Sequence, residues 1–419
     1  MAYLSPGVYV EEVPSSIKAI AGVSTSTPGF IGIIPNKIHL VAKDPETAPT
    51  EAAPSPHKFV DFNVAVPAKS PRLITNWTQF TRLFGDLVGD ETAAKTTDAT
   101  PAVDAGHRAL AHAVYGFFNN GGSRCFVVRI AAATDIGDAL KAFATIDEIA
   151  LVAMPGNADA AVRDAIVSHC ESVGDRFAIL DGPATASDLT TLTKIPADGG
   201  VAPKNTNYAA WYFPWIRVFD PAEKLAGGDG LIDVPPSGHI AGVYARVDND
   251  RGVHKAPANE AIRGALDVTQ PISKADQDGL NPKGVNCIRV LNNNIFVWGA
   301  RTVGGDINAD LKYVNVRRTL LFLRESIDEG TQWVVFEPNT PALWQKITRN
   351  VTAFLTVVWR AGALFGTTQQ EAFYVKCDAE TNPPELRELG QVVTEIGVAI
   401  VRPAEFVIFR ISQFSAPAK

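Results

Sequence analysis

The sequence of 419 residues contains little that would anchor it in a membrane or direct it to secretion. No apolar stretch approaches the about 18 uninterrupted residues of a membrane-spanning helix. The first residues carry neither the basic nor the apolar region of a secretory signal. Cysteine is also scarce, and the widely spaced Cys125, Cys170, Cys287 and Cys377 form no Cys-X-X-Cys pair. We therefore expect reduced, mostly buried thiols in a cytosolic protein.

Catalytic and cofactor-binding motifs are also missing. The sequence has no Gly-X-Gly-X-X-Gly, no Walker loop and no Gly-X-Ser-X-Gly elbow. Asp181 follows a predicted strand and could be a catalytic or metal-binding carboxylate, but a turn-capping role before Gly182 is favoured because no companion residue is evident. Ser237 is better explained as a helix cap than as a nucleophile, and the spacing of His239 and His254 fits no common zinc site. We expect no catalytic, cofactor-binding or metal-binding residues.

Positive charge is in short supply overall. Lysine and arginine number 38 against 45 aspartates and glutamates, a formal net charge of -7, which argues against general nucleic-acid binding. The stretch 341–370 departs from this balance, since it contains Lys346, Arg349 and Arg360 and no acidic residue. It is a candidate docking face for an acidic partner. A solvated helix face explains the composition equally well, because single surface ion pairs contribute only about 0–1 kcal/mol.

The sequence does have two apolar, strand-forming ends. Residues 5–13 and 402–413 are rich in β-branched and aromatic side chains, and each run begins beside a proline. Chain ends more often fray as polar tails, and exposed strand edges are templates for pairing with another chain. We predict that both ends join sheets of neighbouring copies, with an ordinary intramolecular strand as the alternative. The candidate exchange residues are Val8, Tyr9, Val10, Glu11, Val13, Phe406, Val407, Ile408, Phe409, Arg410 and Ile411.

The interior of the chain predicts an α/β protein. Hydrophobic residues make up 46% and charged residues 20%, as in a globular chain with a sizeable core. Continuous apolar runs alternate with helical stretches, which indicates a largely parallel sheet covered by helices. The buried strands predicted in this way are 29–34, 125–130, 149–154, 177–180 and 208–213.

The last third predicts a second α/β module. Residues 285–298 have the pattern of a hairpin, and 332–336 the pattern of a strand. A long helix begins at Thr340 and Pro341 and runs to about residue 364. Its apolar stripe is Trp344, Ile347, Val351, Phe354, Leu355 and Val358.

These patterns divide the chain into four predicted segments. Residues 1–27 form an N-terminal strand and a linker arm, and 28–104 form the N-terminal part of the core, with a proline-rich surface excursion at 42–71. Residues 105–284 form the α/β domain, and 285–419 form a C-terminal module that ends in the exchange strand.

The sequence resembles the contractile tail sheath proteins of bacteriophages and phage-tail-like injection systems. The resemblance covers nearly the whole chain, in long motifs that occur in order, and is weakest at 42–71. The motifs that carry it are Tyr3–Val13, Ala111–Gly122, Pro236–Tyr244, Gly252–Glu260, Leu280–Asn286, Val297–Thr302, Tyr313–Arg318, Trp333–Asn339, Gly362–Gly366, Glu395–Ala399 and Arg402–Arg410.

The resemblance implies a structural subunit and not an enzyme. Proteins of this family form a helical sheath of stacked hexameric rings around an inner tube, and contraction of the sheath drives the tube through a target envelope. The middle α/β layer is then subtilisin-like but non-catalytic, and terminal strands of different copies join one sheet. The C-terminal module faces the tube, so Lys346, Arg349 and Arg360 would meet an acidic tube surface.

The resemblance also implies partners and a location. Besides other copies of the chain, the partners are the inner tube protein, the baseplate and the tail terminator or cap proteins, with no direct contact to nucleic acid or membrane. Assembly is expected in the cytoplasm, in a phage tail or a tail-like particle that can be released from the cell.

Two alternatives stay open at this point. A tail adaptor or terminator with the sheath fold would form capped rings and never long tubes. An α/β hydrolase with Asp181 near its site would show an Asp181-dependent activity as a monomer.

Overall fold

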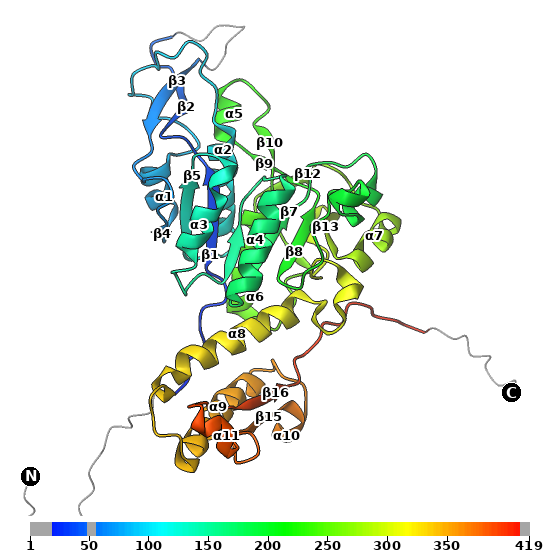
Figure 1. Ribbon diagram of the computed structural model, residues 1–419. Coiled ribbons are helices and arrows are strands. Elements are labelled where there is room, and N and C mark those ends of the chain that lie inside the picture. The colour runs from blue at the N-terminus through cyan, green and yellow to red at the C-terminus, as the bar shows by residue number, and fades with distance from the viewer. Residues whose placement is uncertain (1–18, 48–55, 411–419) are drawn as a thin grey trace, which may run out of the picture. The chain divides into compact units, whose positions relative to one another are not determined.

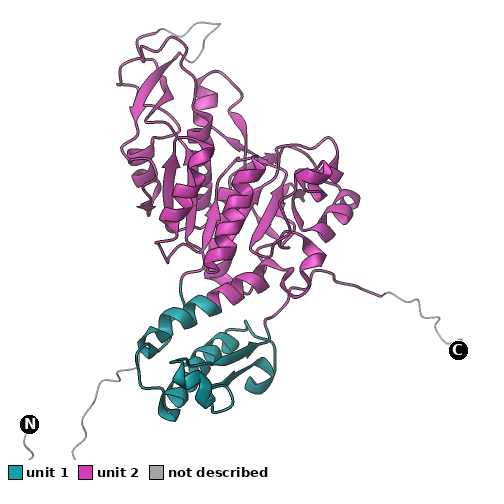
Figure 2. Cartoon of the chain, in the orientation of Figure 1, with its two compact units in different colours: residues 1–23, 323–399 teal, residues 24–322, 400–419 magenta. Residues whose placement is uncertain are grey.

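The computed structural model describes residues 19–47 and 56–410 (Figure 1). The chain forms two compact units (Figure 2). Unit 1 comprises residues 1–23 and 323–399, and unit 2 comprises residues 24–322 and 400–419. The segment that follows residue 399 therefore belongs to unit 2 and not to the unit that precedes it in the chain.

Unit 2 is built on a sheet whose central strands are parallel. Its six central strands all pair in parallel with their neighbours among them, and antiparallel strands lie at both edges. This arrangement confirms the predicted α/β fold with a largely parallel sheet. In the described residues the sheet has nine strands, in the order β11 (Glu260–Ala261), β14 (Asn294–Val297), β13 (Val285–Leu291), β8 (Ala209–Phe213), β7 (Phe177–Asp181), β6 (Leu151–Ala153), β1 (Pro28–Ile33), β5 (Cys125–Ile130) and β4 (Arg72–Ile74).

Helices cover both faces of this sheet because its central strands are apolar on both sides. Phe30 and Ile31, neighbours on β1, are both fully buried and belong to different hydrophobic clusters. Each cluster combines one face of the sheet with a pair of helices. The pairs are α2 (Ala105–Asn119) with α6 (Ser237–Arg251), and α3 (Ile136–Phe143) with α4 (Ala160–Val173).

Glycines allow α2 and α6 to approach closely. A Cβ added at Gly238 on α6 would overlap the backbone of Ala113 on α2. A Cβ added at Gly242 would likewise overlap the carbonyl oxygen of Phe117. Because backbone atoms cannot move aside as a flexible side chain can, glycine is required at both positions.

Smaller sheets and short helices complete unit 2. The sequence predicts a surface excursion at 42–71, but the described part of that stretch contains a strand whose Val60 is only 2% exposed, because its apolar side chains pack against the core. Strand β2 (Lys37–Lys43) pairs with β3 (His57–Asn63), and β9 (Ile216–Phe219) pairs with β10 (Leu231–Val234) and β12 (Ala265–Val268). The helices are α1 (Trp77–Phe84), α5 (Pro221–Leu225) and α7 (Lys274–Leu280), with 3-10 turns η1 (Ala133–Asp135), η2 (Leu189–Thr193), η3 (Pro196–Asp198), η4 (Asn281–Lys283) and η5 (Gly305–Leu311).

Unit 1 contains a long amphipathic helix and a small sheet. Helix α9 (Pro341–Arg360) buries the whole predicted apolar stripe from Trp344 to Val358, and it ends at Arg360, earlier than predicted. In the described residues the sheet has two strands, β15 (Phe373–Lys376) and β16 (Glu395–Val398), which are antiparallel. The other helices are α8 (Val314–Thr331), which contributes residues to both units, α10 (Gln369–Ala372), α11 (Pro384–Glu388) and the 3-10 turn η6 (Gln332–Val334).

Two predicted features of the last third lie differently in the structure. The expected strand at 332–336 is the 3-10 turn η6, and Phe336 has a φ of 68°, which ends any extended run. The expected boundary at 284/285 lies inside unit 2, because β13 pairs in parallel with β8. In the part of the chain that the structure describes, no helix has the length and apolarity needed to span a membrane.

Candidate functional site

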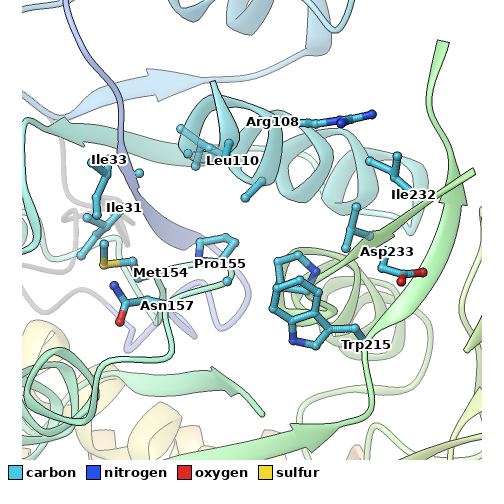
Figure 3. Close-up of a pocket in the computed structure, with 17 residues that line it drawn as sticks. Ile31, Ile33, Arg108, Leu110, Met154, Pro155, Asn157, Trp215, Ile232 and Asp233 are labelled. Carbon is cyan, nitrogen blue, oxygen red and sulfur yellow. The ribbon is translucent and has the colours of Figure 1, made fainter. Parts of the chain in front are cut away.

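The main sheet has a cavity where its strand order reverses. Strand β1 lies between β5 and β6, and ligands of doubly wound sheets bind beyond the carboxyl ends of the strands at such a position. The cavity has a volume of about 360 Å³ and is lined by the ends of β1 and β6, the start of α2 and the segment before α6 (Figure 3). Its lining is mainly apolar and includes Ile33, Leu110, Met154, Pro155 and Trp215.

The charged side chains at this cavity are paired with other protein groups. Nε of Arg108 donates to Oδ2 of Asp220 at 2.6 Å, and its Nη2 donates to Glu223 at 3.1 Å. Asp233 accepts a hydrogen bond from Nε of Arg217 at 2.9 Å. Among the described residues that line the cavity, no acid, base and nucleophile converge, so the geometry favours apolar packing over catalysis.

Asp220 joins two helices at the edge of this cavity. Besides Arg108, it accepts hydrogen bonds from Nε2 of His112 at 3.1 Å and from the backbone N–H groups of Ala222 and Glu223 at 2.6 and 3.0 Å. Burial by itself would raise the pKa of Asp220, but the hydrogen bonds from His112 and Arg108 outweigh it and hold that pKa well below its usual range. The charged carboxylate therefore caps α5 and neutralises Arg108.

Asp181, the candidate carboxylate of the sequence, is committed to a structural contact. Its Oδ1 accepts from the N–H of Ser237 at 2.8 Å, and its Oδ2 accepts from Oγ of Ser237 at 2.7 Å and the N–H of Gly156 at 3.2 Å. Pro236 is the N-cap of α6, so the prediction that Ser237 caps this helix is wrong, and the hydroxyl faces Asp181 instead. Burial raises the pKa of Asp181 to about 6. Asp181 is 4% and Ser237 0% exposed, which places both groups out of reach of a substrate.

The histidines considered from the sequence have separate surroundings. His239 is buried against α2, where a Cβ at Gly116 would overlap its imidazole ring, and burial lowers the pKa of His239 to about 3. Asp248, which lies between His239 and His254 in the sequence, accepts two hydrogen bonds from Arg318, at 2.9 and 2.5 Å. The sequence spacing therefore does not translate into a shared site.

A group with metal-ligand chemistry lies on the β2–β3 hairpin. His39, Asp61 and Asp98 each place a ligand atom within 4.8 Å of the others. Nδ1 of His39 is 3.0 Å from Asp61, and its Nε2 is 3.0 Å from Asp98. The ammonium of Lys37 is 2.9 Å from the same Asp98 oxygen that His39 approaches. Because the carboxylates already have these partners, the group is best described as an ion-pair network that holds residue 98 to the hairpin.

The basic face predicted on α9 is open to solvent. Lys346, Arg349 and Arg360 are all exposed, and among the described residues none of them forms an ion pair. Arg349 also lines a groove of about 730 Å³ between α9 and the end of β15, together with Thr352 and Val375. The three cations predicted from the sequence are thus available to a partner.

The predicted exchange segments are only partly described. Residues 8–13 and Ile411 lie outside the described residues. The four residues Phe406–Phe409 are between 67% and 84% exposed, Arg410 is exposed, and in the described part of the chain they pair with no strand. Consecutive large apolar side chains in solvent are typical of an interaction surface, and the predicted exchange stays a prediction.

Comparison with known proteins assigns this molecule to the structural proteins of contractile tails. The model of the phage tail sheath protein central domain matches residues 131–303, and the model of the phage tail sheath C-terminal domain matches residues 306–414. The chain belongs to the phage tail sheath protein family, and the resemblance inferred from the sequence is confirmed.

Curated relatives carry the same description. The chain is 26% identical over 272 residues to a prophage major tail sheath protein of Pseudomonas aeruginosa (strain UCBPP-PA14), which covers 62% of this chain and 64% of the relative. It is 26% identical over 201 residues to the tail sheath protein of Burkholderia phage BcepMu, covering 46% of this chain and 40% of the relative. Each match spans less than two thirds of the relative's length.

Solved structures extend the likeness over nearly the whole chain. The sheath complex of an extracellular contractile injection system, PVC, in its contracted state has a TM-score of 0.72 and 28% identity, covering 99% of this chain and 98% of that one. The helical sheath of the anti-feeding prophage in its contracted state has a TM-score of 0.69 and 26% identity, covering 98% and 100%. The fold is therefore that of sheath subunits from phage-tail-like particles.

Proposed function

We propose that this chain is the repeating, non-enzymatic subunit of a contractile sheath. The observation that carries this proposal is the likeness to sheaths in the contracted state, which covers 98–99% of the chain. In the proposed particle the chain polymerises as stacked hexameric rings around an inner tube, and contraction drives the tube through a target envelope. Baseplate and terminator or cap proteins bound the polymer at its two ends.

Strand exchange is the proposed link between copies. The exposed residues Phe406–Phe409 would each contribute about 1.5–3 kcal/mol when buried in a neighbour's sheet. The acceptor we favour is the sheet of β15 and β16, because in the described residues each of these strands has one edge without a partner. Two-stranded sheets are at best marginally stable alone, so added strands from the ends of other copies would complete it. On the N-terminal side, Val8–Glu11 and Val13 are the proposed donors.

The proposed contact to the inner tube is the basic face of α9. Lys346, Arg349 and Arg360 are exposed on a helix that lacks acidic residues, which suits an acidic tube surface. Each contact is weak by itself, and repetition along the polymer makes the sum significant. A helix face that only binds water is the alternative that substitution of these residues would test.

The remaining expectations follow from the same proposal. Assembly takes place in the cytoplasm, the particle can act outside the cell, and the chain needs no cofactor and no direct contact with nucleic acid or membrane. The hydrolase alternative has lost its main support, since Asp181 is buried and bonded to Ser237 and Gly156. An adaptor or terminator remains the second candidate, because it would share the fold and differ only in the extent of polymerisation.

Electron microscopy of the protein, expressed alone and together with its inner tube protein, tests the proposal. Long hollow cylinders, extended with the tube or contracted without it, are the expected result. Single closed rings under both conditions would support the adaptor candidate, and monomers under both conditions would overturn the sheath proposal.

A further inference from the structure

The C-terminal segment is attached to unit 2 immediately before its exposed apolar residues. The carbonyl of Val401 accepts a hydrogen bond from Nδ2 of Asn315 at 3.3 Å, and Arg402 forms an ion pair with Asp310 at 2.7 Å. This ion pair is largely exposed and contributes little stability. A much stronger attachment occurs at Glu405, the residue that directly precedes the exposed run.

Both carboxylate oxygens of Glu405 accept hydrogen bonds from unit 2. Arg301 binds in bidentate geometry, with Nε donating to Oε1 and Nη2 donating to Oε2, each at 2.8 Å. Nδ2 of Asn281 also donates to Oε1 at 2.6 Å, and the hydroxyl of Tyr313 donates to Oε2 at 2.8 Å. Burial opposes ionisation, but these hydrogen bonds outweigh it and lower the pKa of Glu405. We refer to Glu405, Asn281, Arg301 and Tyr313 as the Glu405 clamp.

The receiving side of the clamp is fixed to the main sheet. Arg301 is 3% exposed, and its Nη1 donates to the carbonyl of Asn281 at 3.2 Å and to Asp306 at 3.0 Å. The backbone N–H of Arg301 donates to Oδ1 of Asn286 on β13 at 2.7 Å. Arg301 is thus held in place before Glu405 binds, and the carboxylate meets a preformed fork of donors.

We propose that Glu405 is a positioning residue that sets the point from which the C-terminal strand leaves unit 2 toward a neighbouring copy. This inference rests on the proposed strand exchange and adds the residue that controls its reach. A donated strand reaches its acceptor only over the chain beyond its last fixed residue. Without the clamp, release of residues 401–405 would lengthen this tether by roughly 17 Å, since each extended residue spans about 3.3–3.6 Å. Every copy in a helical polymer repeats the same contact, so a fixed departure point keeps the spacing of neighbours uniform.

The first test compares Glu405→Gln with Asp306→Asn. Both substitutions remove one carboxylate partner of Arg301, but Asp306 is not part of the C-terminal segment. In the purified protein before assembly, Glu405→Gln should accelerate hydrogen exchange of the backbone amides at 400–405, except at Pro403, which has no N–H, by at least tenfold. It should reduce the yield of regular cylinders in electron micrographs by a similar factor. Asp306→Asn should change neither. Equal behaviour of the two variants would overturn the inference.

A second variant separates reach from folding. Insertion of two glycines between Glu405 and Phe406 leaves the clamp intact and lengthens the tether by roughly 7 Å. We expect unchanged hydrogen exchange at 400–405, together with irregular cylinders or altered ring spacing. Regular cylinders of wild-type spacing would contradict a positioning role, because the length beyond the clamp would then not matter.

Removal of residues 406–419 distinguishes this inference from the strand exchange on which it rests. If that truncated chain still forms long cylinders, strand exchange itself is wrong, and the positioning role is wrong with it. If truncation abolishes cylinders while Glu405→Gln and the insertion assemble normally, exchange stands and only the positioning role fails. If all three variants lose regular assembly, both proposals are supported.

Discussion

The two units differ in how completely they pair their own strands. In its described residues, unit 2 has a nine-stranded sheet with helices on both faces, and Phe30 and Ile31 on its central strand are fully buried. The described sheet of unit 1 has two strands, and exposed apolar side chains such as Phe365 and Tyr374 lie nearby in the chain, at 74% and 53% exposure. From this difference we expect that unit 2 folds from its own residues, and that unit 1 needs the proposed donated strands to complete its sheet.

Deletion of residues 1–13 tests most directly whether unit 1, unlike unit 2, needs strands from other copies. If unit 1 depends on donated strands, the truncated chain should form no long cylinders, because each copy would lack one strand that its neighbour needs. Unit 2 should keep its cooperative thermal transition, since its described core contains no residue from this segment. Electron microscopy and calorimetry measure the two effects. Normal cylinders from this variant would show that the N-terminal segment is not a structural link.

A substitution in the core of unit 2 should strongly lower the stability of the fold, whereas the deletion of residues 1–13 acts on assembly. Phe30→Ala removes a fully buried aromatic ring from the central strand and should lower the free energy of unfolding by about 3–5 kcal/mol. Val357→Ala on the exposed face of α9, where Val357 is 66% exposed, should change it by less than about 0.5 kcal/mol. Denaturant unfolding of the unassembled protein gives both values. Similar values for both variants would mean that the ring of Phe30 is not part of a packed core.

The sequence predicted the local features of both units better than their long-range partners. Apolar runs identified the parallel strands because a strand buried on both faces must be apolar throughout. The hairpin of β13 and β14 was also predictable, since Asn292 and Asn293 adopt the positive φ angles of its turn. The pairing of β13 with β8 was not, because neither strand carries a local signal for its neighbour.

The same limit applies to the candidate sites. The cations of α9 could be found because they share one helix face, a local property. Glu405 was overlooked because its partners Asn281, Arg301 and Tyr313 are about a hundred residues away in the sequence. A single acid directly before an apolar run was the one available signal. The strand predicted at 332–336 from its apolar composition is wrong, because residues 332–334 form a 3-10 turn and Phe336 has a positive φ.

A charge reversal on α9 tests whether this helix of unit 1 binds the acidic surface of the inner tube. It should affect folding less than Phe30→Ala does. The double variant Lys346→Glu and Arg349→Glu should assemble less sheath around the inner tube, by roughly tenfold at low salt, while the monomer stays folded. The difference should shrink at high salt because exposed charges are screened. Co-sedimentation of sheath with tube measures the effect.

The matched control for that variant carries the same change of charge on unit 2. Lys141→Glu with Lys194→Glu likewise replaces two exposed basic residues by acids and should leave sheathing of the tube unchanged. If both double variants reduce sheathing equally, net charge and not the α9 face is responsible.

The last expected effect is confined to unit 2 and concerns the pH dependence of its stability. The pKa of Asp181 is raised by burial from 3.8 to about 6, so its folded-state carboxyl binds a proton more tightly than in the unfolded chain. Its contribution to stability is fully present below about pH 4 and is lost as the pH rises through 6. The loss amounts to about 3 kcal/mol, since one pKa unit corresponds to about 1.4 kcal/mol. Denaturant unfolding at pH 4 and pH 7 should therefore show that wild type loses stability relative to Asp181→Asn as the pH rises.

Asp220 provides a control of opposite sign within the same unit. Its pKa is lowered because the hydrogen bonds from His112 and Arg108 outweigh burial, so its contribution is present above the ordinary aspartate value and is lost as the pH falls below it. Relative to Asp220→Asn, wild type should thus gain stability as the pH rises from 3 to 5, whereas relative to Asp181→Asn it loses stability as the pH rises from 4 to 7. Two variants with the same pH slope would mean that neither carboxylate sets the pH response of unit 2. Opposite slopes would assign the pH response of unit 2 to these two buried carboxylates, because their pKa values are shifted in opposite directions.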